Sequence, residues 1–298
     1  MFLICTPYTF LFFSIYTIIL FFIFNISNFY IFWLFIEIRI LLFIGVCYTL
    51  FTNRYSQLMV YFLFQTLGSF SILVFYILNS FYLLFFSIFF KLGIFPFFSW
   101  YLNVVFRFPS FIIFLATTIH KLPSLFILYL CLDVKYLNFI YLSVFFTILV
   151  SGIFIIKIVD LRYLIVVSSI GNNSFLLLAV IRNNFITFLL FFIIYSLNIY
   201  IILNMFNNQT IIVSSIQISN YSTILLILLL FNIASIPPLP GFFTKFLIFY
   251  ELLPTIENFI FFFILIMLVN IFIIVSYIQI LFKIIVNIYS SSSIYLLN

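Results

Sequence analysis

The sequence predicts an all-α integral membrane protein with about ten transmembrane helices, two of them broken. Hydrophobic residues make up 68% of the 298 positions and charged residues only 5%. A soluble domain carries about 25% charged residues, so this chain cannot cover a surface that faces water. Its apolar runs are about 20 residues long, as membrane-spanning helices require, and do not alternate over about ten residues like barrel strands. We therefore expect one polytopic membrane domain over residues 1–298.

The expected spans are the apolar runs between polar or charged turns. They cover residues 8–26, 29–50, 57–78, 81–100, 109–132, 136–158, 164–181, 185–205, 221–253 and 258–285. The fourth and the ninth span each contain helix-breaking residues. Two approximate repeats, 8–132 and 136–285, would each hold one of these broken spans.

The first break lies in the segment FFKLGIFPFFSW at residues 89–100. Lys91 sits in an otherwise apolar run, and Gly93 and Pro96, which are both unfavourable inside a helix, follow it. Roughly ten apolar residues precede the lysine and seven follow, so at about 1.5 Å per residue its side chain does not reach the membrane surface. A buried ammonium costs about 2.5 to 3.5 kcal/mol on insertion scales. We expect a titratable group at a helix break, as in ion pathways; the alternative is a lysine beside a loop.

The second break lies in the segment SIPPLPG at residues 235–241, inside the ninth span. Three prolines and a glycine cannot continue a helix, so two half-helices are expected to meet here. Lys245 follows in the second half. Each broken span therefore carries a lysine close to its break.

The titratable groups expected deepest in the spans are Glu37, Lys91, Lys121 and Lys245. Burial penalises the charged form of each group, and a nearby opposite charge restores it. Groups coupled in this way titrate as a set, which is the minimum machinery of a proton relay. His120 could share a proton with the pathway of Lys121 or serve as a neutral hydrogen-bonding side chain. The alternative for the whole set is structural ion pairing between helices.

The sequence offers few ligands for a metal or redox cofactor. It contains three cysteines, far apart and without a CxxC spacing, and one histidine. We therefore expect no metal, haem, flavin or iron–sulfur cluster in this chain. We interpret the net charge of +6 as a membrane topology signal and expect no nucleic-acid partner.

The composition points to an AT-rich gene. The chain has 50 Phe and 20 Tyr but only 6 Gly, and glycine has GC-rich codons whereas phenylalanine and tyrosine have AT-rich ones. The start at Met1 shows no basic segment, cleavage site or Arg/Ser-rich amphipathic prelude, so we expect neither a signal nor a transit peptide. Both observations favour a product encoded in an organelle.

Five segments, in the same order along the chain, resemble the subunit 2 family of the proton-pumping NADH:ubiquinone oxidoreductase, mitochondrial respiratory complex I. The matches are Trp33 and Glu37 to W-x-x-x-E, KLGIFPFFSW to K-x-G-x-x-P-F-H-x-W, TTIHKLPSL to T-W-Q-K-x-x-P, LRYLIVVSSIGNNSF to L-R-K-x-x-A-Y-S-S-I-x-H-x-G-W, and IPPLPGFFTKFLI to L-P-P-L-T-G-F-x-x-K-W. One such match is weak, but five in family order are strong.

The resemblance implies an antiporter-like fold with two inverted repeats, each with one broken helix. It implies that Glu37 is coupled to Lys91, that Lys121 is the central relay lysine, and that Lys245 belongs to the second broken helix. The activity would be that of a cofactor-free subunit of H⁺-translocating NADH:ubiquinone reductase, in the mitochondrial inner membrane. NADH, FMN, iron–sulfur clusters and ubiquinone would bind elsewhere in the assembly.

The partners implied by the resemblance are other membrane-arm subunits, including a neighbouring antiporter-like subunit, and membrane lipids. The sequence departs from the family pattern at Phe98, Asn172 and Ser174, which stand where the family has His, His and Gly. Water or asparagine side chains would have to replace those histidines. Two alternatives are a stand-alone cation/proton antiporter of the same fold and a structural scaffold whose channel has degenerated.

Overall fold

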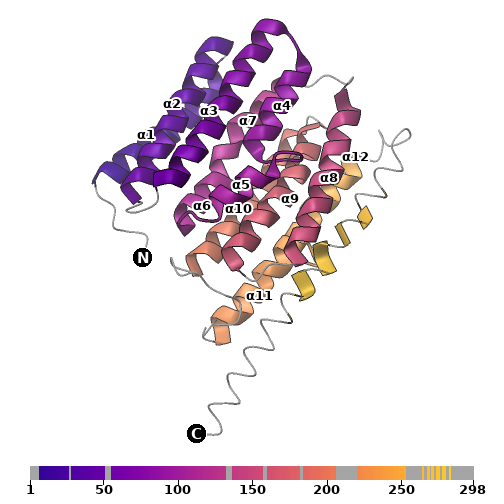
Figure 1. Ribbon diagram of the computed structural model, residues 1–298. Coiled ribbons are helices and arrows are strands. Elements are labelled where there is room, and N and C mark those ends of the chain that lie inside the picture. The colour runs from indigo at the N-terminus through magenta and orange to yellow at the C-terminus, as the bar shows by residue number, and fades with distance from the viewer. Residues whose placement is uncertain are drawn as a thin grey trace. The chain divides into compact units, whose positions relative to one another are not determined.

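A computed structural model describes residues 7–26, 28–50, 55–131, 136–156, 160–181, 184–205 and 220–252, and isolated positions between 264 and 282. Every secondary-structure element in these ranges is a helix (Figure 1), which confirms the all-α prediction. The chain divides into two compact units, Met1–Leu132 and Asp133–Asn298, called here the N-terminal and C-terminal units.

Six helical segments in the described ranges are long and apolar enough to cross a membrane. They are Phe29–Leu50, Ser56–Leu78, Ser110–Cys131, Leu137–Ile156, Leu161–Ile181 and Phe185–Met205. Three shorter apolar helices cover Thr9–Asn25, Phe81–Leu92 and Ile224–Ala234. The last expected span, 258–285, falls outside the described residues except at isolated positions. The count of ten spans therefore stays a prediction.

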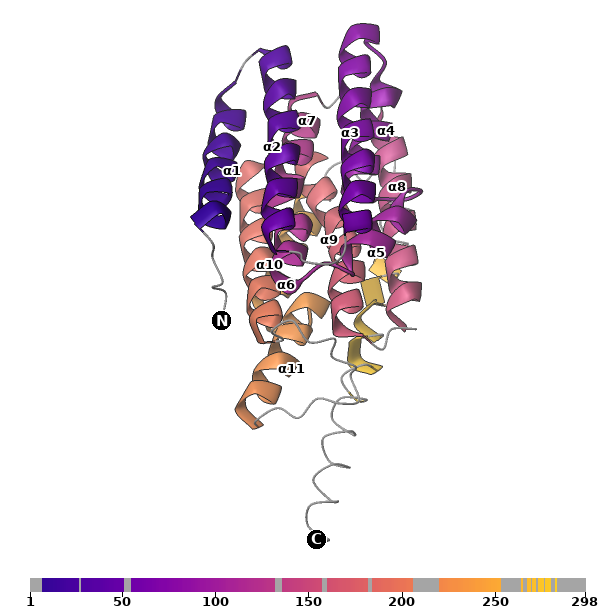
Figure 2. The ribbon, with the colours of Figure 1, turned by 60° about the vertical axis from the view of Figure 1, so that its left-hand side comes forward.

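The N-terminal unit begins with three long apolar helices. The helices of this unit are α1 (Pro7–Asn25), α2 (Phe29–Leu50), α3 (Tyr55–Leu78), α4 (Phe81–Leu92), α5 (Phe98–Val105), α6 (Ser110–Thr117), the 3₁₀-helix η1 (Ile119–Lys121) and α7 (Leu122–Cys131). Helix α2 packs between α1 and α3, and α3 also packs against α4 and α5. Figure 2 shows α2 and α3 as neighbouring rods.

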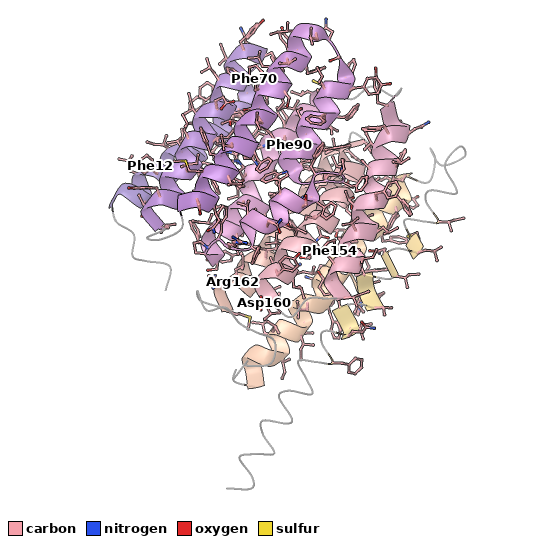
Figure 3. All side chains as sticks on the ribbon, viewed as in Figure 1. Phe12, Phe70, Phe90, Phe154, Asp160 and Arg162 are labelled. Carbon is pink, nitrogen blue, oxygen red and sulfur yellow. The ribbon has the colours of Figure 1, made fainter. Side chains whose placement is uncertain are left out.

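Aromatic and aliphatic side chains cover the outside of these helices (Figure 3). Phe70 on α3, for example, is 60% exposed, and Phe10 and Phe21 on α1 are each 70% exposed. Such a surface is unfavourable in water but matches the hydrocarbon core of a bilayer. Arg39, Lys91 and Lys121 are instead buried between the helices, and Glu37 and His120 are partly buried.

Gly93 ends helix α4. Its backbone has φ of 67°, in the left-handed region, and a Cβ atom at this position would lie 2.6 Å from Cβ and Cγ of Tyr101. Only glycine fits both requirements without strain. The N–H of Ile94 bonds back to the Phe89 carbonyl at 3.0 Å, and the ring N–H of Trp100 donates to the Phe90 carbonyl at 3.1 Å. These donors satisfy carbonyls that the end of α4 leaves without helical partners.

The segment between residues 110 and 131 is interrupted, whereas the sequence analysis expects it to be one continuous span. Helix α6 ends at Thr117, and η1 precedes α7. Pro123 explains part of this, because a proline has no N–H to donate to the carbonyl four residues earlier, here that of Ile119. The Ile119 carbonyl accepts instead from the N–H of Leu122 and from the guanidinium of Arg39 on α2.

The C-terminal unit is built around α9 (Leu161–Ile181). Helix α9 contacts α8 (Leu137–Ile156), α10 (Phe185–Met205) and α12 (Pro240–Leu252), and nearly all of its residues are buried. Helix α11 (Asn220–Ala234) contacts α10 and α12. The polar stretch SSIGNNS at residues 168–174 is thus held inside the unit by apolar neighbours.

The chain is interrupted again between α11 and α12, with the same backbone pattern as at Gly93. Ser235 has φ of 62°, and the N–H of Ile236 bonds back to the Phe231 carbonyl at 3.1 Å. A cis X–Pro bond follows at both places, Phe95–Pro96 and Pro237–Pro238. Helix α12 then begins at Pro240. Both interruptions lie where the sequence places helix-breaking residues.

Candidate functional site

Glu37 faces helix α3 and is bound there by a serine. The hydroxyl of Ser69 donates to Oε1 of Glu37 and also lies 2.9 Å from the Thr66 carbonyl. Trp33, one turn before Glu37 on α2, donates its ring N–H to the Ser69 carbonyl at 2.8 Å. The W-x-x-x-E spacing therefore puts both side chains on the same face of α2, against one residue of α3.

Lys91 lies against the same face of α3, one residue away from Ser69. The lysine is 7% exposed, and a Cβ atom on Gly68 would lie only 2.6 Å from its Cγ. Gln65, one turn earlier, donates its amide N–H to the Lys91 carbonyl at 3.4 Å. In the described part of the chain, neither Glu37 nor Lys91 forms a direct ion pair. Their electrostatic coupling stays a prediction, with α3 as the element that both side chains contact.

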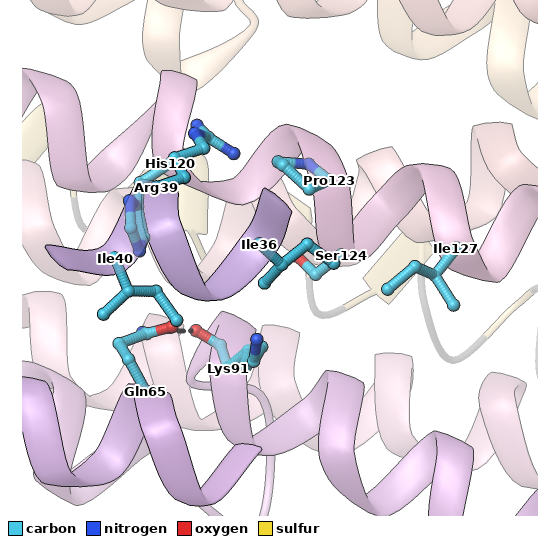
Figure 4. Close-up of a pocket in the computed structure, with 9 residues that line it drawn as sticks. All are labelled: Ile36, Arg39, Ile40, Gln65, Lys91, His120, Pro123, Ser124 and Ile127. Carbon is cyan, nitrogen blue, oxygen red and sulfur yellow. Dashed lines mark hydrogen bonds between the residues drawn. The ribbon is translucent and has the colours of Figure 1, made fainter. Parts of the chain in front are cut away.

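A buried cavity connects Lys91 with His120 (Figure 4). Its volume is about 20 Å³, which exceeds the roughly 10–15 Å³ that one water molecule needs. It is lined by Ile36, Arg39, Ile40, Gln65, Lys91, His120, Pro123, Ser124 and Ile127. Figure 4 shows Arg39 beside His120, and Gln65 beside Lys91. The structure therefore brings two of the predicted residues, Lys91 and His120, to one polar cavity, and Glu37 and Lys121 do not line it.

Arg39 is a charged residue of this cavity that the sequence does not single out as a site residue. It is 2% exposed and donates to the hydroxyl of Tyr16 at 2.9 Å. Its guanidinium carbon lies 4.8 Å from the centre of the Tyr16 ring. Because the Tyr16 oxygen accepts from Arg39, its own proton is available to Nδ1 of His120, 3.3 Å away. This arrangement favours the neutral tautomer of His120, with its proton on Nε2.

Lys121 lies next to the interruption between α6 and α7. It is 3% exposed, and its Nζ lies 4.6 Å from the centre of the Tyr101 ring. The Tyr101 hydroxyl donates to the Ala116 carbonyl at 3.2 Å, near the end of α6. A ring face stabilises a buried cation, by about 2 kcal/mol when both are desolvated. Helix α5 thus places an aromatic ring against Lys121.

Lys245 has an equivalent aromatic environment in the C-terminal unit. It is 5% exposed, with its Nζ 4.4 Å from the centre of the Phe175 ring on α9. Its Nζ also lies 3.5 Å from Oδ1 of Asn270. The single amide in the otherwise apolar run at residues 259–275 is the sequence signal that points to this partner.

Two cavities border Lys245. The first, of about 20 Å³, is lined by Asn172, Phe191, Ile194, Tyr195, Asn198, Asn232, Ile233, Ser235, Gly241, Thr244 and Lys245. The second, of about 10 Å³, is lined by Ser151, Ile155, Ser168, Gly171, Asn172, Phe175, Ile233, Lys245, Ile273 and Tyr277. Asn172, which replaces a histidine of the resembled family, lines both cavities with Lys245, whereas the Ser174 hydroxyl bonds to the Gly171 carbonyl of its own helix.

An asparagine joins helices α11 and α12 across the second interruption. Oδ1 of Asn232 accepts from the backbone N–H of Gly241 at 2.6 Å, and its Nδ2 donates to Asn198 on α10 at 2.8 Å. A Cβ atom on Gly241 would overlap the Asn232 carbonyl, so this position requires glycine. The contact fixes the start of α12 and thereby the position of Lys245, one turn further on.

No group of three or more His, Cys, Asp or Glu residues is placed to hold a metal ion in the described ranges. What these ranges do hold is a set of buried lysines beside helix interruptions, with polar cavities next to two of them. Such an arrangement is typical of membrane proteins that move ions or protons.

The comparison with known families agrees with that class. Residues 75–273 match the family described as "NADH:quinone oxidoreductase/Mrp antiporter, TM". The match covers more than half of the chain, so the chain belongs to this family of antiporter-like membrane subunits. No curated protein was found to match the sequence.

The fold is shared by many solved structures, including the following three. A chain of respiratory complex I from Thermus thermophilus with bound aureothin has a TM-score of 0.72 and 16% identity, over 85% of this chain and 65% of that one. A chain of the membrane-bound sulfane sulfur reductase, an archaeal respiratory membrane complex, has a TM-score of 0.69 and 16% identity, over 85% of this chain and 50% of that one. A chain of the Mrp complex from Dietzia sp. DQ12-45-1b has a TM-score of 0.70 and 14% identity, over 84% of this chain and 55% of that one. This chain therefore spans about 65% or less of the length of these relatives.

Proposed function

We propose that this chain is a proton-translocating membrane-arm subunit of NADH:ubiquinone oxidoreductase, complex I, corresponding to its mitochondrial subunit 2. One observation carries the proposal. Each unit holds a deeply buried lysine close to a helix interruption and beside a cavity large enough for water, Lys91 in the first and Lys245 in the second. A structural ion pair would require a carboxylate in direct contact with these lysines, and neither lysine forms such a salt bridge among the described residues, although the charge of Glu37 acts on Lys91.

In this proposal, α4 with α5 and α11 with α12 are the two broken transmembrane helices of inverted repeats. Broken backbone is tolerated at membrane depth only where protein covers it. The start of each interruption is buried, with Ile94 0% exposed and Ser235 3% exposed, whereas Pro96, Pro237 and Pro238 are exposed on this chain and would need a neighbouring subunit to cover them. The third interruption, at Lys121, then lies within the span Ser110–Cys131.

The contact between Glu37 and Ser69 offers a defined proton step. A serine hydroxyl has one proton, so it donates either to the carboxylate of Glu37 or to the Thr66 carbonyl. When Glu37 is ionised, the hydroxyl donates to it. When Glu37 takes up a proton, the carboxyl group donates to Ser69, and the hydroxyl turns to Thr66. The contact thus adapts to both protonation states without a change of helix position.

In the next step of the proposed relay, Lys91 passes its proton through the polar cavity toward His120. His120 lines the same cavity, and Lys121 follows it directly in the chain. Water in the cavity would bridge the lysine and the imidazole, because a space of about 20 Å³ lined by polar groups suits an ordered water. Lys121 would receive the proton next, and Lys245 would be the relay group of the C-terminal unit.

Lys245 is suited to this role because it borders two cavities. A proton that arrives from the side of Asn232 and Thr244 would leave to the side of Ser168 and Tyr277 after the ammonium changes rotamer. Asn172 lines both sides and would orient water there in place of the missing histidine. Departure from the family pattern at this position is therefore compatible with proton transfer.

The chain would act without a cofactor of its own. NADH, FMN, iron–sulfur clusters and ubiquinone would belong to other subunits, and quinone chemistry there would alter the coupling of Glu37 and Lys91. The partners would be further membrane-arm subunits, including a neighbouring antiporter-like subunit, together with membrane lipids. The AT-rich composition supports synthesis in mitochondria and insertion into their inner membrane.

A second candidate is a cation/proton antiporter that works without electron transfer. The family description and the structural likeness to a chain of an Mrp complex favour it. Purification through a tag on this chain separates the two. A complex I subunit brings with it a large particle that oxidises NADH with ubiquinone as acceptor. Recovery of an assembled particle without NADH oxidation, but with cation-driven proton exchange, would instead establish the antiporter.

A further inference from the structure

The cavity between Arg39, Lys91 and His120 has an unusual charge composition. Two basic side chains, an imidazole and an amide line it, and no carboxylate of the described residues does. Ser124 also lines it, but its hydroxyl donates to the Lys121 carbonyl at 2.7 Å. The remaining polar groups are mainly donors of hydrogen bonds. Donors without a facing acceptor are what an anion requires.

Arg39 makes the positive charge of this cavity permanent. A guanidinium does not lose its proton in a protein, whereas the ammonium of a lysine can. Arg39 is 2% exposed, and its Nε is buried with no hydrogen-bond acceptor among the described residues. The two groups that accept hydrogen bonds from Arg39, the Tyr16 hydroxyl and the Ile119 carbonyl, are uncharged. Burying a charge without an opposite charge nearby is strongly unfavourable, so a negative charge in this cavity would stabilise Arg39.

The protein itself supplies too little negative charge here. Glu37 is the only acidic residue in the sequence from 1 to 132. Its carboxylate is bound by Ser69 and does not line the cavity. The negative charge of Glu37 can neutralise the positive charge of Arg39 as long as Lys91 is uncharged. Once Lys91 is protonated, the balance requires a further anion.

We propose that the cavity between Arg39, Lys91 and His120 binds one small monovalent anion, of halide size, when Lys91 is protonated. Arg39 Nε, Lys91 Nζ and the second amide N–H of Gln65 are the donors available to it. The volume of about 20 Å³ admits one small ion and no organic anion. Binding would be independent of electron transfer, so it does not depend on the function proposed above.

Equilibrium binding of radioactive chloride to the purified membrane assembly tests this inference. We expect Arg39→Gln to lose about one bound chloride per copy of the chain, and Lys91→Met to weaken that site at least about tenfold. The matched control is Arg107→Gln, which removes an exposed arginine of the same unit and should leave the count unchanged. An unchanged chloride count in both Arg39→Gln and Lys91→Met would overturn the proposal.

A second measurement does not require the variants to assemble. In a density map of the unaltered assembly prepared in bromide, the ion should give a strong anomalous peak in the cavity, within about 3.5 Å of Arg39 Nε. Density of water strength at that place, unchanged when bromide replaces gluconate, would refute anion binding. Because neither measurement uses NADH turnover, a failed proton-pumping experiment would leave this result standing, and the reverse also holds.

Discussion

Replacing Lys245 by methionine separates proton transfer from packing. Methionine keeps most of the apolar stem but has no titratable group. The change removes the contact of the ammonium with the Phe175 ring, worth about 0.5 to 2 kcal/mol, and the hydrogen bond to Asn270. At 3.5 Å that bond is at the limit of length, so its loss costs about 1 kcal/mol.

The substitution also removes the cost of burying a charged ammonium group, which offsets these losses in stability. Placing a lysine at membrane depth costs about 2.5 to 3.5 kcal/mol. The net change in stability is therefore within about 1 to 2 kcal/mol of zero, and the assembly should form at normal amounts. Loss of a positioned acid–base group slows a proton transfer by about 10² to 10⁴. Proton pumping should thus fall at least about tenfold, together with NADH oxidation in the coupled enzyme.

The assay is NADH-driven acidification in proteoliposomes, with the amount of assembled particle measured on native gels. Phe246→Met is the matched control, because this neighbouring side chain on α12 is 54% exposed and should affect neither quantity. An assembled Lys245→Met particle that pumps at the normal rate would show that Lys245 is not on the proton path.

Two further substitutions test the geometry of each unit. Gly68→Ala should displace Lys91, lower the unfolding free energy of the unit by about 1 to 3 kcal/mol and reduce proton pumping. The control Gly45→Ala should have a smaller effect, because its Cβ would meet only the Phe12 ring, at 3.2 Å. Equal effects of the two substitutions on thermal unfolding and on pumping would contradict this. Asn232→Ala should leave the N–H of Gly241 without its acceptor and lower the unfolding free energy by about 1 to 3 kcal/mol, and an unchanged melting temperature would show that this contact does not hold α12.

The interruptions after α4 and after α11 could be predicted because their signals are local. Gly93 with Pro96, and the three prolines before Gly241, prevent continuation of a helix whatever surrounds them. The buried lysines could be predicted for a similar reason, since a charge in the middle of an apolar run has no local route to water. These features depend on a few neighbouring residues, and the structure places the interruptions there.

The third interruption could not be predicted, because it depends on a partner from another helix. Pro123 leaves the Ile119 carbonyl without the N–H donor that a continuous helix would provide. A proline is nevertheless common in the first turn of a helix, so Pro123 alone does not predict that the span is interrupted. Arg39, 80 residues earlier, completes the arrangement by donating to that carbonyl. The spacing of two residues does place Arg39 on a different face of α2 from Glu37. That this face meets Tyr16 and His120 could not be predicted, because packing between helices decides it.

The buried partners of the lysines were missed for the same reason. Phe175 and Tyr101 are two of many aromatic residues in a chain with 50 Phe and 20 Tyr, so composition does not single them out. Only their distances of 4.4 and 4.6 Å from Lys245 and Lys121 identify them as cation partners. Ser69 likewise reads as an ordinary helix serine until its hydroxyl is found on Glu37.

The central claim is that Glu37 and Lys91 act as one coupled unit in proton transfer, through the face of α3 that both contact. A double-mutant cycle with Glu37→Gln and Lys91→Met, measured as proton pumping in the assembled particle, tests it most directly. If the account is right, each single variant loses pumping to a similar extent and the double variant is hardly worse than either. Losses that add in the double variant would mean that the two residues act independently, which would contradict the relay.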